Sequence, residues 1–373
     1  MSVRRRGKRI VRIVRVPFEW LGIGLGIAVI SILPRRWMLA LCDFISMVMY
    51  AFDASGRGLA LFNLRVVTGC GEVKGLPFSR NVRLRLSPPT RRESLIIRRS
   101  YRNMARTVGH AFWTCRNAAM RVAESGVMSE RGHRFLAENK PAVTVSGHIG
   151  CWEILSQLAF LEGHKMMSVA KDIGTSGMTR LLMKSRTSIG QEIVHADGAF
   201  RPLMQGMKDG KSLGLLVDQV VKPKNGGVWV RFFGRPMPVS AAPAFFAAKG
   251  KAPVAVAWSR PLRDGRYRCE VVSTYSPQAA RDVWGLTQAC MDDLARVIRR
   301  HPSCWVLNYR YFRKTPTDGE LAQLRTRIAH AVFGRAGAHD GEAHPSCDRL
   351  RGSLRSGDMS PRCFRSRRSA PLP

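Results

Sequence analysis

Residues 143–155 join an apolar run to the start of a helix, and they read Val143-Thr144-Val145-Ser146-Gly147-His148-Ile149-Gly150-Cys151-Trp152-Glu153-Ile154-Leu155. The β-branched beginning predicts a short buried strand that ends at Gly147. His148 follows at the carboxyl end of this strand, where open α/β sheets place their ligands. The apolar residues after Glu153 predict a helix whose first turn holds this acid. The stretch therefore indicates a strand, a turn and a helix, with an imidazole in the turn.

The same alternation of apolar runs and helical stretches continues from about residue 140 to residue 313. Further strands are predicted at 167–170, 192–194, 213–217 and 252–258, and helices at 154–161, 178–186 and 283–300. Such alternation is typical of an α/β fold with a largely parallel central sheet flanked by helices. Before this region, the pattern predicts a short helix around residues 59–64 and a basic helix from about residue 91 to residue 123.

The charge balance of the 373-residue chain is strongly basic. Lys and Arg number 61 against 26 Asp and Glu, which gives a formal net charge of +35. Such an excess attracts polyanions, and nucleic acid, anionic lipid headgroups and an acidic carrier protein all fit it. Composition alone does not choose among these partners.

Cysteine use argues against a disulfide framework and against a zinc site. The nine cysteines are scattered, their number is odd, and no two form a C-x-x-C pair. We interpret them as reduced thiols of a protein that faces the cytosol.

Two apolar segments near the N-terminus indicate contact with a membrane. Residues 18–33 and 37–52 are almost free of charge, and a basic cluster precedes them: Arg4, Arg5, Arg6, Lys8, Arg9, Arg12 and Arg15. Each segment has about 16 residues, short of the roughly 20 that a helix needs to cross a bilayer. A tight hairpin is one solution, and a tilted span followed by an interfacial helix is another. The alternative is a pair of buried core helices.

The chain divides into three parts by composition. Residues 1–56 form a basic N-terminus with a hydrophobic membrane-anchoring segment, residues 57–333 form the α/β domain, and residues 334–373 form a basic tail. The tail is rich in Arg, Ser, Gly and Pro and poor in large apolar residues, which predicts disorder.

His148 and Glu153 are the candidate catalytic pair. Across a strand-to-helix turn, the Glu153 carboxylate can accept a proton from one imidazole nitrogen and leave the other nitrogen free as a base. N–H groups at the helix start offer a place for a developing oxyanion. The alternatives are a histidine without a special role and an acid that simply favours a first helical turn. Cys151 is a rival nucleophile, although a thiol next to a histidine in sequence does not establish the geometry of nucleophilic catalysis.

The turn also resembles a known motif. Gly147-His148-Ile149-Gly150-Cys151-Trp152-Glu153 is similar to the H-x4-E motif of the lipid A biosynthesis acyltransferases, which include lauroyl and myristoyl transferases and belong to the wider lysophospholipid acyltransferase-like superfamily. Other segments resemble the family in the same order, at residues 57–64, 98–108, 214–219, 232–236 and 301–310. Two positions depart from the family. Cys151 stands where the family usually has Asn, and the closing segment reads Leu307-Asn308-Tyr309-Arg310 in place of a Trp-rich run.

The resemblance implies O-acyl transfer from an acyl thioester, with acyl carrier protein as the donor and a lipid A precursor or a related glycolipid as the acceptor. It makes His148 the general base and Glu153 the residue that orients the imidazole. No cofactor and no metal are implied, since a thioester is already activated. Related mycobacterial mannolipid acyltransferases take the acid partner of the histidine from a later strand, so Asp218 is a rival to Glu153. The candidate substrate-binding residues are Asp218, Gln219, Arg186 and Arg235.

These expectations place the protein at the bacterial inner membrane, with the active site on the cytoplasmic side and an anionic membrane surface as a partner. Two alternatives stay open. One is a hydrolase that uses the same histidine to activate water, and the other is a non-catalytic binder of anionic lipid or nucleic acid. The apolar N-terminus argues against the binder, and nucleic acid is not expected as a partner.

Overall fold

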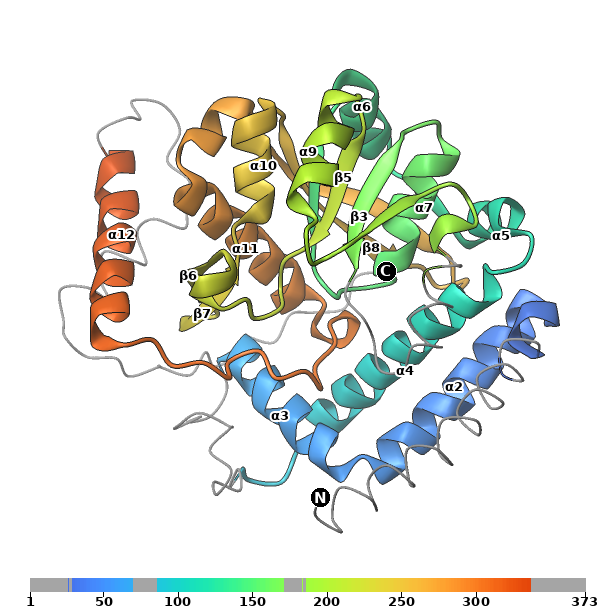
Figure 1. Ribbon diagram of the computed structural model, residues 1–373. Helices are drawn as coiled ribbons and strands as arrows, with labels where there is room; N and C mark the ends of the chain where they lie inside the picture. Colours follow the sequence, from blue (N-terminus) through green and yellow to red (C-terminus); the bar gives the residue numbers. More distant parts are fainter. Residues whose placement is uncertain (1–25, 27–28, 70–85, 171–182, 184–185, 337–373) are drawn as a thin grey trace, which may run out of the picture.

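A seven-stranded sheet forms the centre of the molecule (Figure 1), in the strand order β1-β9-β8-β2-β5-β3-β4. The structure is a computed structural model, and it describes residues 26, 29–69, 86–170, 183 and 186–336. The strands are β1 (Gly126–Met128), β2 (Val143–Ser146), β3 (Met166–Ala170), β4 (Glu192–His195), β5 (Ser212–Leu216), β8 (Val254–Pro261) and β9 (Tyr267–Tyr275). Neighbouring strands from β8 to β4 run parallel, whereas β9 runs antiparallel to β8. The predicted α/β fold with a largely parallel sheet flanked by helices is confirmed.

Helices cover both faces of the sheet. Along β8, Val254 and Val256 join one core cluster and Ala255 joins another, because successive side chains of a strand point to opposite faces. The first face packs against α9 (Phe200–Lys208), α10 (Ala242–Gly250) and α11 (Val283–Arg300), and the second against α6 (Glu130–Glu138) and α7 (Trp152–Leu161). Burial on both faces explains why the central strands are nearly continuous apolar runs.

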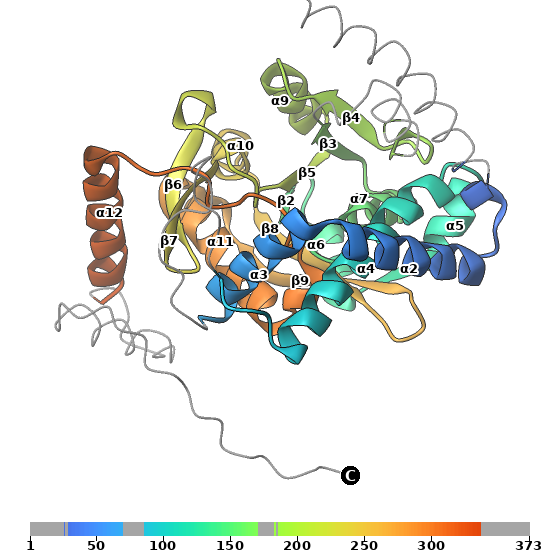
Figure 2. The same cartoon turned by 90° about the horizontal axis from the view of Figure 1, so that it is seen from below.

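Helices α2 (Arg35–Phe52), α3 (Ala54–Thr68), α4 (Arg91–Trp113) and α5 (Ala118–Ser125) precede the first strand, β1. Figure 1 shows the first three below the sheet, and Figure 2 shows α2 running alongside α4. A capping box starts α4, since the Thr90 side chain accepts from the Glu93 N–H and the Glu93 carboxylate accepts from the Thr90 N–H. The single basic helix predicted over residues 91–123 is wrong, because the helix ends at Trp113 and the chain turns through Asn117 in the left-handed region.

The consecutive helices α2 and α3 differ sharply in burial. Every residue of α3 from Leu59 to Val67 is buried, whereas α2 exposes large side chains such as Phe44 and Phe52. Within the described chain, no single helix is long and apolar enough to cross a membrane. The pair α2 and α3 meets that length and composition only when taken together, with a 94° bend between the two helices. Most of the first predicted apolar segment, residues 18–33, lies outside the described residues, and α2 corresponds to the second segment.

The C-terminal half adds elements that the sequence did not predict. An antiparallel hairpin of β6 (Gly227–Phe232) and β7 (Arg235–Ser240) lies outside the main sheet and packs against α11. Short 3-10 turns occupy Pro223–Asn225, Pro277–Arg281 and Pro302–Cys304. The last helix, α12 (Asp318–Ala336), enters the region predicted as a disordered tail, and residues 337–373 of that tail lie outside the described residues. The predicted helix at 178–186 falls mostly outside them as well.

Candidate active site

The carboxyl ends of two neighbouring parallel strands, β2 and β5, bring His148 and Asp218 together. Ser146 of β2 is in register with Leu216 of β5, and the Val217 N–H donates to the Ser146 carbonyl, which continues the pairing by one residue. His148 and Asp218 therefore leave the sheet side by side, although they are far apart in sequence. This is the sheet edge at which open α/β folds bind their ligands.

The Asp218 carboxylate holds His148 through two contacts. Its Oδ1 lies 2.7 Å from the imidazole Nδ1, and its Oδ2 accepts from the His148 backbone N–H at 2.9 Å. The Trp305 indole N–H also donates to Oδ2, at 2.9 Å. Burial raises the pKa of the fully buried Asp218 carboxyl, but the adjacent His148 and these hydrogen bonds outweigh burial and hold the pKa below its usual value. The carboxylate is therefore ionised and fixed in orientation.

This arrangement selects the imidazole tautomer. An ionised carboxylate only accepts hydrogen bonds, so Nδ1 carries the proton and Nε2 carries the lone pair. The Gln219 side-chain amide nitrogen lies 3.2 Å from Nε2, and the Trp152 ring meets the imidazole edge-on at 4.9 Å between ring centres. The His148 side chain is 20% exposed while Asp218 is 0% exposed, so Nε2 is the nitrogen that is not held by the carboxylate, and its neighbour is the Gln219 amide.

Glu153 does not hydrogen-bond to His148, so the prediction that it orients the imidazole is wrong. Its carboxylate accepts from the Arg186 guanidinium at 2.6 and 2.8 Å and from the Trp152 indole N–H at 3.0 Å. Burial raises the pKa of Glu153, but the charge and hydrogen bonds of Arg186 outweigh it and hold the pKa low. The physical reason is strand pairing: β5 already places Asp218 against Nδ1, and α7 starts at Trp152, which places Glu153 in the buried first turn.

The turn that carries His148 is held from two other parts of the chain. Gly150 has φ +65°, and a Cβ there would collide with the Ser259 carbonyl, so only glycine fits. The Gly150 carbonyl accepts from the Asn103 side chain at 3.1 Å, and its N–H donates to the Cys304 carbonyl at 2.9 Å. The Ile149 N–H donates to the Gly147 carbonyl. Both N–H groups are therefore used inside the structure and are not available to an oxyanion. The helix-start N–H groups belong to α7, which begins at Trp152, and their role as an oxyanion site stays a prediction.

The four predicted substrate-binding residues do not all lie at His148. Gln219 and Asp218 meet His148, and Arg186 is joined to Glu153 rather than to the imidazole. Arg235, at the start of β7, places its guanidinium 5.5 Å from the centre of the Phe62 ring of α3.

Cys151 is an unsuitable nucleophile in this position. The side chain is fully buried, and burial raises the pKa of its thiol to about 12, further from the reactive thiolate. The described residues hold no group of three or more His, Cys, Asp or Glu side chains that could bind a metal ion.

Trp305 is the functional residue that sequence reasoning missed. It is fully buried, stacks on Tyr311 at 4.0 Å between ring centres, and holds Oδ2 of Asp218. The family resemblance covered residues 301–310, but it did not indicate that Trp305 binds the Asp218 carboxylate. The whole site therefore combines a carboxylate, an imidazole whose Nε2 is held only by the Gln219 amide, and an aromatic wall, and such an arrangement is able to act as a general base.

Comparison with known proteins agrees with this chemistry. The family model of the bacterial lipid A biosynthesis acyltransferases matches residues 79–314, well over half of the chain. The match includes His148, Asp218 and Trp305. A search of curated proteins finds no match.

Proposed function

The chain belongs to the bacterial lipid A biosynthesis acyltransferase family, and from that premise we propose that it transfers a fatty acyl group from an acyl thioester to a hydroxyl of a lipid A precursor or a related glycolipid. Acyl transfer in lipid A synthesis is the activity of the family. The observation that carries the proposed mechanism is the Asp218–His148 pair, in which the carboxylate holds Nδ1 and leaves Nε2 for the substrate in place of Gln219.

In the proposed reaction, His148 takes one proton from the acceptor hydroxyl and gives it to the departing thiolate. Nε2 of His148 takes the proton of the acceptor hydroxyl while that oxygen attacks the thioester carbonyl carbon. The tetrahedral intermediate then collapses, the carbon–sulfur bond breaks, and the imidazolium returns its proton to the departing thiolate. Asp218 stays ionised throughout and stabilises the imidazolium, as a buried carboxylate does beside a catalytic histidine.

The donor and the location belong to the same proposal. A net charge of +35 suits both an acidic acyl carrier protein and an anionic membrane surface. The family resemblance supports acyl carrier protein as the donor and a lauroyl or myristoyl chain as the acyl group. We assign the enzyme to the cytoplasmic face of the bacterial inner membrane, where such a carrier meets the lipid acceptor.

Mass spectrometry of membrane lipids tests the proposal. Cells that carry the wild-type chain should contain a glycolipid heavier by one acyl group than cells that carry His148→Ala at the same protein level. The purified enzyme should consume acyl thioester only when acceptor is present. Equal release of free fatty acid with and without acceptor would instead identify a hydrolase and overturn the assignment.

A further inference from the structure

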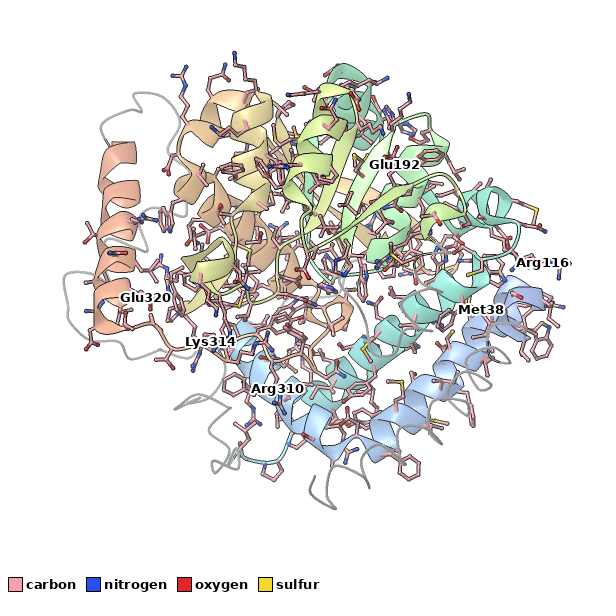
Figure 3. All side chains as sticks on the ribbon, viewed as in Figure 1. Met38, Arg116, Glu192, Arg310, Lys314 and Glu320 are labelled. Atoms are coloured by element: carbon pink, nitrogen blue, oxygen red, sulfur yellow. The ribbon has the colours of Figure 1, made fainter. Side chains whose placement is uncertain are left out.

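A groove with a volume of about 760 Å³ runs between α2 and α4. Met47 and Tyr50 line it from α2, and Leu95, Arg98, Arg99 and Arg102 line it from α4. The spacing of the four α4 residues places them on one stripe of the helix, since residues three and four apart are neighbours on a helix surface. Met38, labelled in Figure 3, lies on the side of α2 that packs against α4 and joins the two helices beyond the Arg102 end of the groove.

The arginines of the groove have no acidic partner among the described residues. The one acid of α4, Glu93, is bound by Arg65, and Asp43 of α2 is bound at 2.6 Å by Arg106, one turn beyond the groove. No described carboxylate lies within ion-pair distance of the exposed Arg98, Arg99 or Arg102.

Tyr50 orients part of this charge. The guanidinium of Arg98 lies 5.0 Å from the centre of the Tyr50 ring, and that of Arg57 lies 5.4 Å from it. The Tyr50 ring therefore holds Arg98 at the groove, and Arg57 is fixed there also by hydrogen bonds that its guanidinium donates to the Tyr50 and Ala51 carbonyls. The result is a fixed cluster of positive charge with an apolar floor, which suits a phosphate attached to hydrocarbon.

The face of α2 next to the groove is apolar and open. Trp37, Phe44, Val48 and Phe52 follow helical spacing along it, and Phe44 and Phe52 are 59% and 85% exposed. Exposed apolar surface of this extent is unfavourable in water and marks an interaction site. An apolar helix face flanked by arginine is the arrangement of helices that lie in a membrane interface.

We propose that the α2–α4 groove binds the phosphate of an anionic glycerophospholipid in the bilayer surface, while the adjoining face of α2 enters the acyl region. An acidic protein or a nucleic acid would satisfy the arginines but would leave Phe44 and Phe52 in water, whereas a lipid satisfies both. This site goes beyond the acyl-transfer chemistry, because it binds a lipid that the enzyme does not modify.

Vesicle partitioning of the full chain tests the site. Phosphatidylcholine vesicles with and without phosphatidylglycerol are the probe, at an ionic strength of about 0.15 M. The groove variant is Arg98→Gln/Arg99→Gln/Arg102→Gln. Its matched control is Arg91→Gln/Arg92→Gln/Arg281→Gln, which removes the same charge from exposed positions outside the groove. The groove variant should lose about tenfold or more in partitioning to phosphatidylglycerol vesicles, and the control should lose much less.

Two outcomes overturn the proposal. Equal losses in the two variants would mean that only total charge matters, and wild-type partitioning of the groove variant would mean that the groove binds no lipid. The variant Phe44→Ser/Val48→Ser tests the apolar face, since it should be released from vesicles by high salt more completely than the wild type. Retention equal to that of the wild type would remove α2 from the interface. The readout is binding, so it is independent of the proposed reaction.

Discussion

Two buried carboxylates lie near the same edge of the sheet, Asp218 after β5 and Glu153 in the first turn of α7, and their partners make them different. Both have a lowered pKa because the side chain that each one holds outweighs the effect of burial, Arg186 for Glu153 and His148 for Asp218. Glu153 holds an arginine, which keeps its proton at every physiological pH, whereas Asp218 holds an imidazole, which can exchange one. The comparison teaches that the partner, and not the burial of the acid, decides whether a buried ion pair is structural or catalytic.

Replacing the base should have the largest effect on turnover. His148→Ala removes Nε2 and should lower acyl transfer by about a hundredfold to ten thousandfold, the range of general-base catalysis. Turnover is measured with purified protein at saturating donor and acceptor, after circular dichroism has confirmed the fold. Near-normal turnover in this variant would end the proposed mechanism.

Replacing Asp218, which contacts the His148 imidazole, should have the next largest effect on turnover. In Asp218→Asn the new amide can donate to Nδ1, which moves the imidazole proton to Nε2 and blocks the base. We expect turnover to fall by at least about tenfold through kcat, with KM for the acceptor little changed. A variant with unchanged kcat would show that the tautomer is set by another group.

Replacing Glu153, which pairs with Arg186, should lower the stability of the fold more than the rate of acyl transfer. Glu153→Gln leaves the Arg186 guanidinium without its counter-charge, and breaking a buried pair costs about 3–5 kcal/mol. Chemical denaturation should show this loss, and Arg186→Met in the same background should restore part of it. If Glu153→Gln instead lowers kcat as much as Asp218→Asn and leaves stability intact, the comparison is reversed.

The same pair predicts a pH dependence of stability. The pKa of Glu153 is lower in the folded than in the unfolded protein, so its stabilisation is complete above the unfolded value near 4.5 and is lost as pH falls through the folded value. The free energy of unfolding of the wild type should therefore decrease on acidification more than that of Glu153→Gln. Parallel curves for the two proteins would contradict the assignment.

The smallest effect should follow from changing the thiol beside the site. Cys151→Ala removes a buried group whose raised pKa keeps it protonated, so turnover should stay close to that of the wild type. Thiol-alkylating reagents should likewise leave the folded enzyme active. Loss of turnover in a folded Cys151→Ala protein would make the thiol a nucleophile after all.

Local patterns predicted much of the fold. The β-branched run before Gly147 became β2, and α11 begins and ends where the helical periodicity predicted. The β6–β7 hairpin and β9 were missed, since their short polar-interrupted runs give a weak signal. The apolar segment 37–52 gave an ambiguous signal, since a membrane helix and a buried core helix share its composition, and only packing shows that α2 exposes one apolar face while α3 is buried.

The site was predictable in its residues but not in its pairing. His148 could be found from its place at the end of a strand, and Asp218 and Gln219 from the end of a later one. Which acid meets Nδ1 depends on β5 lying next to β2, and strand order is a non-local property that no short window of sequence contains. Trp305 reaches Asp218 from 87 positions further along the chain, so its role was equally hidden.

Helix α4 would fix the distance between the site and a bilayer that is bound at the groove. Arg102 faces the groove, and Asn103, about 100° further round the helix, holds the carbonyl of Gly150 in the turn that carries His148. A bilayer bound at the groove would then lie within about one helix width, roughly 10–12 Å, of that turn. An acceptor lipid would need to rise by only that distance to present its hydroxyl, and its hydrocarbon tails could stay in the membrane while a water-borne donor arrives from the opposite direction.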